Sequence, residues 1–392
     1  MSDSLGALSG IKVLDLTDER GIYGVKLLAD LGADVVRPEP VAGDPLRQRG
    51  PRLKDQSLWH TYFASNRRFV TLDPNQSEGS ALLAQLVAAA DIVVICAGAF
   101  CVAEARCPQV LEERPDLVVV DVSSFGDEGP WKDYLAPDLV AGALGGAAAT
   151  TGDVDTPPLK SFGELNFMVS GTYAAIAALS ALLHVRGGGS GQRVGVSVHE
   201  CIASCLEHVL MWYLYQDKLA GAKGPHLPRQ GSLHWSNAYK VMTAKTGSIM
   251  VTPAPDFEAQ MFWLVEEDAQ EDLIDPKYLE LENRPLMVQR MMEVLHGWVA
   301  SKDAQALFHE AQARHAPYGW VLPVDKLATN PQLEARAWFT DYVVAGTTLK
   351  GPGAPYQFSA TPWRIKPDAE VTTGTPGEVL AAVGWAAEGS GS

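Results

Sequence analysis

The sequence predicts an α/β protein whose larger domain is built on a parallel β-sheet. Over the first 125 residues, short apolar strands alternate with helical segments. A long apolar helix follows at 173–185, and the glycine-rich run 187–191 ends it sharply. Alternating strands and helices are typical of a parallel sheet covered by helices on both faces, and a chain of 392 residues can hold a second domain.

The elements of the larger domain are expected in a regular order. Apolar runs predict strands at 12–16, 34–37, 91–95 and 117–122. Amphipathic or alanine-rich segments predict helices at 23–31 and 76–90. Gly32 and Pro38 punctuate the pattern, since glycine commonly ends a helix and proline cannot donate to a sheet ladder. Two further helices are expected at 173–185 and 200–215, the first of them apolar almost all round and therefore buried.

A second, smaller domain of α+β type is expected at 225–320. Residues 221–228 are rich in Gly, Pro and Lys and are interpreted as a linker, which leaves 1–220 for the first part of the larger domain. Beyond the linker, short strands are mixed with helices rich in Glu and Met. The chain is therefore expected to hold two domains of unequal size.

Composition excludes several functional classes. The formal net charge of −16 argues against a nucleic-acid partner, because such proteins usually carry a basic surface. No run of about 18 apolar residues suggests a membrane span, and the N-terminus lacks the features of a secretory signal. We therefore expect a cytoplasmic protein without a membrane partner. The Gly-x-Gly-x-x-Gly pattern is absent after the first strand, so no NAD site is expected.

The five cysteines are expected to be free and mostly buried thiols. One cluster, His199-x-Cys201-x3-Cys205-x2-His208, has a spacing that could hold a metal ion on one helical face. Apolar neighbours at 202, 206, 209 and 210 favour a core helix instead, and structural zinc sites normally take four ligands from two segments. No metal is therefore expected.

Ordered motifs across nearly the whole chain resemble one known family. They lie at 10–17, 27–36, 43–47, 66–73, 123–130, 145–152, 189–194 and 330–336. On these motifs the chain resembles the family III CoA-transferases of the CaiB/BaiF type, which include formyl-CoA transferase, carnitine CoA-transferase and α-methylacyl-CoA racemase. The resemblance implies coenzyme A or an acyl-CoA as substrate. It also implies a Rossmann-like large domain formed by both chain ends, with 321–392 returning to it, and an interlocked ring-like dimer.

The resemblance also implies that the central chemical group of the family is missing. An aspartate of the family stands four residues before the glycine of the central helix and attacks the acyl-CoA. Counting back from Gly171 places Phe167 there, and phenylalanine has no nucleophile. Glu164 is a weak substitute, because its offset of three would point it away from Phe167 in an extended segment, and a surface carboxylate is the favoured interpretation. No catalytic residue is therefore expected in this chain.

Other landmarks of the family are altered together. The loop after the first strand has Asp18–Gly24 where the family usually carries Ala-Gly-Pro. Residues 96–100 replace an Asn-Phe-x-Pro-Gly segment, and Pro137 stands where the racemases have histidine. The Gly turns and Pro-rich termini are meanwhile kept. This contrast favours a subunit retained for its shape.

The resemblance implies four positions for contacts with CoA. These are Asn66, Arg67, Arg68 and Leu72, with Arg20 and Arg37 as weaker candidates. Arginine can hold phosphate through paired N–H donors. The alternative is that Arg67 and Arg68 cap a turn in solvent.

The favoured interpretation is the aspartate-lacking subunit of a heteromeric CoA-transferase, as in benzylsuccinate CoA-transferase. Its partner would be a homologous catalytic subunit, its donor an acyl-CoA such as succinyl-CoA, and its acceptor a carboxylic acid. Two alternatives stay open. One is a self-sufficient acyl-CoA enzyme of altered chemistry, and the other is a CoA-binding scaffold without a reaction.

Overall fold

The computed structural model describes residues 6–101, 113–152, 156–215, 239–253, 256–366 and 371–386. They form two compact units. Unit 1 comprises Met1–Ala147, Lys160–Glu207 and Pro331–Ser392, and unit 2 comprises Ala148–Leu159 and His208–Asn330. The linker expected at 221–228 lies outside the described residues.

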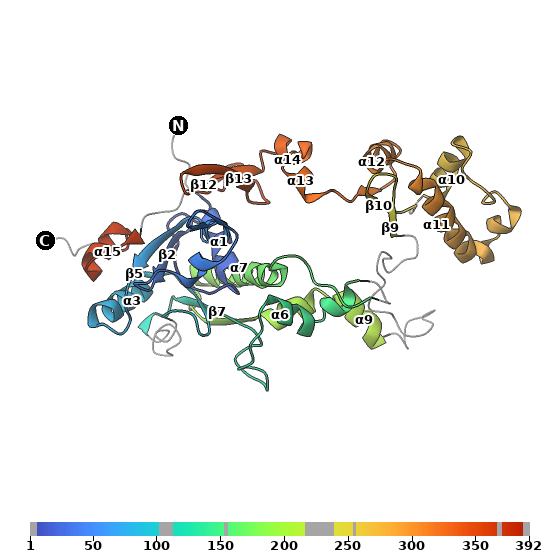
Figure 1. The fold of residues 1–392 in the computed structure, drawn as a ribbon. Coiled ribbons are helices and arrows are strands. Elements are labelled where there is room, and N and C mark those ends of the chain that lie inside the picture. Colours follow the sequence, from blue (N-terminus) through green and yellow to red (C-terminus); the bar gives the residue numbers. More distant parts are fainter. Residues whose placement is uncertain are drawn as a thin grey trace. The chain divides into compact units, whose positions relative to one another are not determined.

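Unit 1 is built on a seven-stranded sheet in which every strand pair is parallel. Strands β2, β5 and β7 of this sheet are labelled in Figure 1. Its order is β14-β5-β2-β1-β6-β7-β8. The strands are β1 (Lys12–Leu16), β2 (Asp34–Glu39), β5 (Arg67–Thr71), β6 (Ile92–Cys96), β7 (Val118–Ser123), β8 (Arg193–Ser197) and β14 (Val371–Thr372). The central strands are nearly continuous Val, Ile and Leu runs, as a sheet buried on both faces requires. The predicted parallel α/β fold is thus confirmed.

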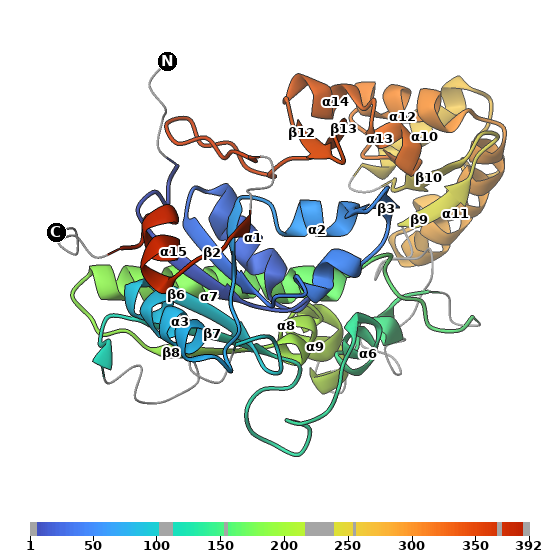
Figure 2. The ribbon, with the colours of Figure 1, turned by 60° about the vertical axis from the view of Figure 1, so that its left-hand side comes forward.

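Helices cover both faces of this sheet. Val13 belongs to an apolar cluster that includes residues of α1 (Ile22–Asp30) and α7 (Leu165–Arg186). The next residue, Leu14, belongs to a second cluster with residues of α3 (Ser77–Ala89) and α15 (Pro376–Ala382). Successive side chains of a strand point to opposite faces, so β1 contributes to both cores. Figure 2 shows α15 beside α3, although the two helices lie almost 300 residues apart in sequence.

The C-terminal segment completes the sheet. β14 pairs with β5, with Val371 opposite Phe69. Nearby, the Asn66 side chain accepts a hydrogen bond of 2.6 Å from Lys366 N and donates one of 2.7 Å to the Arg364 carbonyl. Both ends of the chain therefore build the large unit, as expected.

α1 and α7 cross at two glycines. A Cβ on Gly24 would lie 2.5 Å from the Gly171 carbonyl oxygen, and one on Gly171 would lie 2.7 Å from Gly24 N. Real Cβ atoms essentially never come this close to a backbone atom, so any other residue would push the helices apart. The glycine that the family resemblance singles out is therefore needed for helix packing here.

α7 differs from the expected central helix in three respects. It begins at Leu165 rather than 173, so Glu164 and Phe167 lie on a helical turn and not in an extended segment. It is long and apolar enough to cross a membrane by length and composition, contrary to the expectation that no such run exists. It is also only half covered, because Tyr173, Ile176 and Leu183 are exposed while Ala174, Ala178 and others pack on the sheet. Its packing in unit 1 is that of a core helix with one open face.

Short elements complete unit 1. They are η1 (Pro45–Gln48), β3 (Arg52–Leu53), β4 (Gln56–Ser57), α2 (Leu58–Phe63), α6 (Asp138–Leu144), α8 (Val198–Ser204), α14 (Pro331–Ala335), β12 (Phe339–Val344) and β13 (Thr347–Pro352). The prediction of a single helix at 200–215 is wrong. α8 ends at Ser204, a turn follows, and α9 (Glu207–Tyr215) begins a new helix.

Unit 2 has an antiparallel sheet of three strands, β9 (Lys240–Thr243), β10 (Ser248–Val251) and β11 (Gly319–Trp320), in the order β11-β10-β9. Its helices are η2 (Ala148–Thr150), α10 (Phe257–Glu266), η3 (Pro276–Leu279), η4 (Leu281–Asn283), α11 (Arg284–Ala300), α12 (Ala304–Ala313) and α13 (Val324–Leu327). Large side chains form its core, including Trp263, Trp298 and Tyr318. This α+β unit has its own core and is not an extension of the parallel sheet.

Candidate functional site

The candidate site lies at the carboxyl ends of β1, β6 and β7, where the N-terminus of α7 reaches the sheet edge. Loops at this edge of a parallel sheet commonly bind ligands. Arg20, in the loop after β1, donates to Asp18 at 3.0 Å and to the Ala97 carbonyl after β6 at 2.5 Å. Ser170 of α7 lies between two backbone carbonyls, 3.3 Å from that of Arg20 and 3.0 Å from that of Phe167. Two of the residues singled out in the sequence, Arg20 and Phe167, are thus brought together.

Phe167 is buried at this site. Its side chain is only 3% exposed and belongs to the apolar cluster between the sheet and α7. Its backbone N–H donates to Asp138 Oδ1 at 3.0 Å, and the neighbouring Asn166 Nδ2 donates to Asp138 Oδ2 at 2.9 Å. Asp138, the first residue of α6, therefore caps α7 from another helix, and its charge complements the positive end of the helix dipole. The position holds an aromatic ring and no reactive group.

Glu164, the weak substitute for a nucleophile, is not the surface carboxylate expected. It directly precedes α7 and is half-buried. Its carboxylate forms an ion pair with Arg49 and accepts a hydrogen bond of 3.0 Å from Trp59 Nε1. The Arg49 guanidinium in turn lies 4.5 Å from the centre of the Trp59 ring. Both carboxylate oxygens of Glu164 are thus engaged.

The thiol of Cys96, at the end of β6, is also unsuited to covalent chemistry. Cys96 ends β6 and is fully buried. Burial raises the pKa of the Cys96 thiol well above its ordinary value, so the thiol stays protonated. The thiolate is the nucleophilic form of cysteine, and this cysteine does not reach it near neutral pH.

The residues expected to meet CoA are mostly committed to the fold. Leu72 is buried in the cluster beneath α3 and α15. Arg67 is 1% exposed and donates to Asp15, to the carbonyls of Phe63 and Ser65, and to the Ile22 carbonyl. A phosphate could reach Arg67 only if these bonds were given up, and the alternative of a turn in solvent is wrong for this arginine.

Arg68 and Asn66 lie nearer the surface. The Arg68 side chain is 45% exposed and pairs with Asp34 at 2.8 Å, and it also donates to the Val383 carbonyl. Asn66 adopts a positive φ of 62° and joins the C-terminal segment to Asp30. Of the four expected positions, Arg68 is therefore the cation most accessible to a phosphate.

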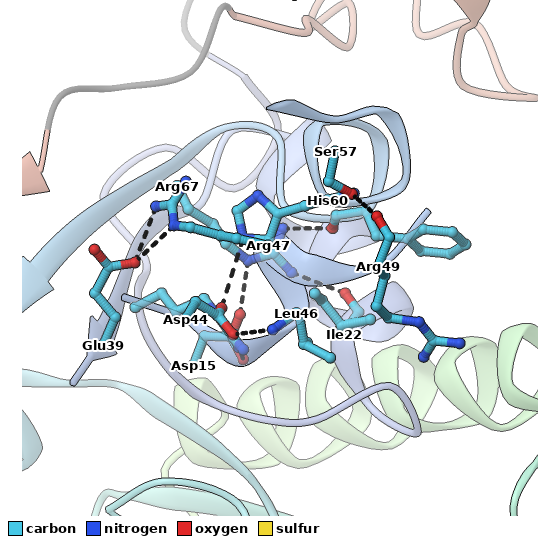
Figure 3. Close-up of polar contacts among 12 residues, drawn as sticks. Asp15, Ile22, Glu39, Asp44, Leu46, Arg47, Arg49, Ser57, His60 and Arg67 are labelled. Atoms are coloured by element: carbon cyan, nitrogen blue, oxygen red, sulfur yellow. Dashed lines mark hydrogen bonds and ion pairs between the residues drawn. The ribbon is translucent and has the colours of Figure 1, made fainter. Parts of the chain in front are cut away.

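Arg37 belongs to a buried charge network. Figure 3 labels three other members of this network, Asp15, Asp44 and Arg67. Asp15 accepts from Arg67 at 2.6 Å and pairs with Arg37 at 3.1 Å, while Arg37 also donates to Asp44 at 2.6 Å. Burial would raise the pKa of Asp15, but the two arginines outweigh it and hold the pKa below its ordinary value. Burial would also raise the pKa of Asp44, but the hydrogen bond with His60 and the charge of Arg37 outweigh it and hold that pKa below its ordinary value. These four charges link β1, β2, the start of β5 and the loop after β2.

A cavity of about 330 Å³ opens at the same edge of the sheet. It is lined by Ala97, Ser123, Gly126, Asp127, Lys132, Asp133 and Arg193. Arg193 is paired with Asp121 at 2.6 Å and also contacts Asp127. Lys132 pairs with Asp133 at 3.3 Å, so the cations of this cavity already have partners of opposite charge.

Sequence reasoning missed Asp138 as the cap of α7, because an acidic residue directly after Pro137 signals only the start of α6. It also missed the Asp15 network, for which a charged residue inside the apolar run 12–16 was the signal.

His199 is the first residue of the cluster whose spacing could hold a metal ion. Its Nε2 lies 3.1 Å from the Leu144 carbonyl, and its ring packs near Phe125 and Trp131. Within the described residues, no group of three or more His, Cys, Asp or Glu side chains could hold a metal ion.

The fold is that of the CaiB/BaiF proteins. A crystal structure of a CaiB/BaiF family protein from Brucella suis superposes with a TM-score of 0.77 and 23% identity, covering 97% of this chain and 100% of that one. A structure from Mycobacterium tuberculosis gives a TM-score of 0.74 at 20% identity, with 94% and 98% covered. The chain belongs to CoA-transferase family III, whose family model matches residues 8–372.

Curated relatives are named for CoA transfer. The formyl-CoA:oxalate CoA-transferase of Streptomyces avermitilis is 27% identical over 95% of this chain and 96% of its own length. The succinyl-CoA–D-citramalate CoA-transferase of Chloroflexus aurantiacus is 28% identical over 84% and 82%. The subunit BbsE of the succinyl-CoA:(R)-benzylsuccinate CoA-transferase of Thauera aromatica is 27% identical over 97% and 95%. The function of this chain is therefore in CoA transfer, and CoA thioesters are the substrates of such enzymes.

Proposed function

We propose that this chain is the non-catalytic subunit of a heteromeric CoA-transferase. The observation that carries the proposal is the buried ring of Phe167 at the start of α7. The family resemblance assigns this position to the nucleophilic aspartate. Two carboxylates at the start of this helix are already engaged in other contacts. Asp138 caps the helix, and Glu164 is paired with Arg49 and Trp59.

The chemistry is then assigned to a homologous partner subunit. Its aspartate attacks the acyl-CoA carbonyl, the carbon–sulfur bond breaks, and CoA leaves as the thiolate while a mixed anhydride forms. The thiolate and the incoming acid complete the exchange through further covalent intermediates. We assign succinyl-CoA as donor, because several relatives are named for it, and a carboxylic acid such as an aromatic succinate as acceptor, because BbsE is named for one.

The open face of α7 supports a protein partner. Tyr173, Ile176 and Leu183 recur at helical spacing and are 40%, 56% and 74% exposed. On α6, Leu139 and Leu144 are also about half exposed. Exposed apolar groups gathered on neighbouring helices are typical of a protein interface. We infer that the partner subunit covers this face in the interlocked dimer of the family, in the cytoplasm.

The test is co-expression with a homologue that carries aspartate at the position aligned with Phe167. We expect a stable complex of the two chains with transferase activity, and none from this chain alone. Hydroxylamine added with acyl-CoA should trap a carboxylate on the partner only. Conversion of the partner's aspartate to asparagine should abolish turnover.

Two other functions predict different results. A self-sufficient enzyme of altered chemistry would turn over alone and lose its activity on Glu164→Gln. A CoA-binding scaffold would bind acyl-CoA in calorimetry, through Arg68 among others, but would support no turnover with any partner. Activity of the purified single chain would reject the proposal of a non-catalytic subunit.

A further inference from the structure

The cavity at the carboxyl edge of the sheet in unit 1 is surrounded by an excess of negative charge, although the family acts on a polyanion. CoA carries a diphosphate and a phosphomonoester, together about four negative charges near neutral pH. Among the described residues that line this cavity or act on its lining, carboxylates outnumber cations. The carboxylates are Asp18, Glu19, Asp121, Asp127 and Asp133, and the cations are Arg20, Lys132 and Arg193.

Arg193 is the arginine that lines the cavity, and two carboxylates share one of its nitrogens. Its Nη2 donates to Asp121 at 2.6 Å and also to Asp127. Asp121 belongs to β7 and is 1% exposed, and a buried charge is screened by salt much less than an exposed one. Lys132, the other cation of the lining, is paired with Asp133 at 3.3 Å. A phosphate that approached either cation would therefore also approach a carboxylate.

Arg20 borders the same cavity and is neutralised in the same way. It donates to the carbonyl of Ala97, which lines the cavity, and its Nε donates to Asp18 at 3.0 Å. Burial would lower the pKa of Arg20, but Asp18 and Glu19 outweigh burial and raise that pKa. The guanidinium is thus held between two carboxylates of its own loop.

Arg68, the accessible cation among the expected CoA contacts, points to the other edge of the sheet. Its guanidinium pairs at 2.8 Å with Asp34, the first residue of β2. The strands of this sheet are parallel, so Asp34 marks the edge opposite to the one at which β6 and β7 end. A strand of five residues spans about 17 Å. Arg68 therefore cannot offset the carboxylates around the cavity.

We propose that Asp127 and Asp133 prevent CoA from binding at the carboxyl edge of this chain, and that the heteromeric complex holds one CoA for each pair of chains. Carboxylates placed against an anionic ligand reject it through like-charge repulsion. The stoichiometry of the complex rests on the proposed function. The exclusion of CoA goes beyond it, because a subunit without a nucleophile could still have kept a CoA site. The thioester then binds only to the chain that can attack it.

The test is calorimetric titration of the full chain with CoA at low ionic strength. The wild-type chain should show no saturable binding up to about 1 mM CoA. The double variant Asp127→Asn/Asp133→Asn leaves Lys132 without its carboxylate and Arg193 with Asp121 alone. It should bind CoA at least about tenfold more tightly than that limit, and its affinity should fall as salt is added. Pantetheine, which lacks the phosphates, should bind no better to the variant than to the wild type.

The matched control is Asp116→Asn. Asp116 precedes β7 at the opposite edge of the sheet and pairs with Arg114 at 2.9 Å, much as Asp127 follows β7 and pairs with Arg193. This variant removes the same charge from the chain and should gain no CoA binding. Equal melting temperatures of the variants and the wild type establish that unit 1 remains folded.

Three results would overturn the proposal. They are saturable CoA binding by the wild-type chain alone, no gain of CoA binding by the folded double variant, and two CoA molecules bound per pair of chains in the purified complex. A chain that binds CoA but turns nothing over would overturn this exclusion and leave the non-catalytic subunit standing. Turnover by the single chain would instead reject the proposed function.

Discussion

Replacement of Phe167 by alanine is expected to destabilise unit 1 while leaving the chemistry of an active complex intact. The ring is 3% exposed and lies in the apolar cluster between the sheet and α7. Deletion of a buried phenylalanine ring typically costs about 3–5 kcal/mol, since the transfer free energy is lost and a cavity remains. Asp138 holds the backbone of Phe167 in place, so the start of α7 cannot move to fill the cavity. We therefore expect a loss of stability at the upper end of this range.

The measurement is urea-induced unfolding at fixed protein concentration, with the free energy of unfolding compared between variants. At a slope of about 3 kcal/mol per molar urea, the midpoint should fall by about 1 M or more. Phe162→Ala is the matched control, since Phe162 lies five residues earlier and is fully exposed, at 101%. A loss below about 1 kcal/mol for Phe167→Ala would refute the buried placement of the ring. Loss of turnover without loss of stability would refute a purely structural role.

Three further changes test other parts of the structure. Gly171→Ala should destabilise by about 1–3 kcal/mol in the same assay because the added methyl meets Gly24 N, whereas Gly297→Ala, on a helix with open space around it, should stabilise slightly. Asp15→Asn should cost about 3–5 kcal/mol near pH 7, since buried Arg67 loses its carboxylate partner and Arg37 keeps only Asp44. The pKa of Asp15 is lowered in the folded state, so its contribution is complete above the unfolded value of about 3.9 and is lost as pH falls through the folded pKa; a difference that stays constant down to pH 2 would contradict this. Glu164→Gln should leave turnover of the complex within about twofold, and a loss of two orders of magnitude would make Glu164 a catalytic residue.

The sheet was predictable because its strands have a clear local sequence pattern. The runs at 12–16 and 117–122 are short, apolar and flanked by turn residues, and both became central parallel strands. The return of the C-terminus was predictable only from the family resemblance. β14 has two residues, Val371 and Thr372, and such a strand is held by its neighbours rather than by its own pattern.

The helix boundaries were harder to predict because remote residues decide them. α7 begins at Leu165 since Asp138, on another helix, satisfies an N–H of its first turn. No local pattern at 161–166 contains that information. The division of 200–215 into two helices was likewise hidden, because both halves are apolar and lack a glycine or proline between them.

The candidate site could also be predicted only in part, because the contacts of its residues depend on distant segments of the chain. Counting four residues back from Gly171 led to Phe167 and to the hypothesis that the nucleophile is missing, but the burial of the Phe167 ring could not be predicted. Arginines at 37 and 67 looked available for phosphate, because a sequence gives their charge and not their partners. Asp15 and Asp44 occupy those guanidinium groups, and these contacts join segments up to 52 residues apart.

The last strand of the sheet also bears on how the chain is made. During synthesis, β5 has emerged and can pair with β2 long before Val371 leaves the ribosome, about 300 residues later. Until then the outer side of β5 is an open edge with unpaired N–H and C=O groups, and such edges invite pairing with other chains. A shortened chain that stops before residue 371 keeps that edge for good, and loses α15, which covers α3. Termination before residue 371 should therefore yield aggregated protein, and the yield of soluble protein should depend on β14 and α15.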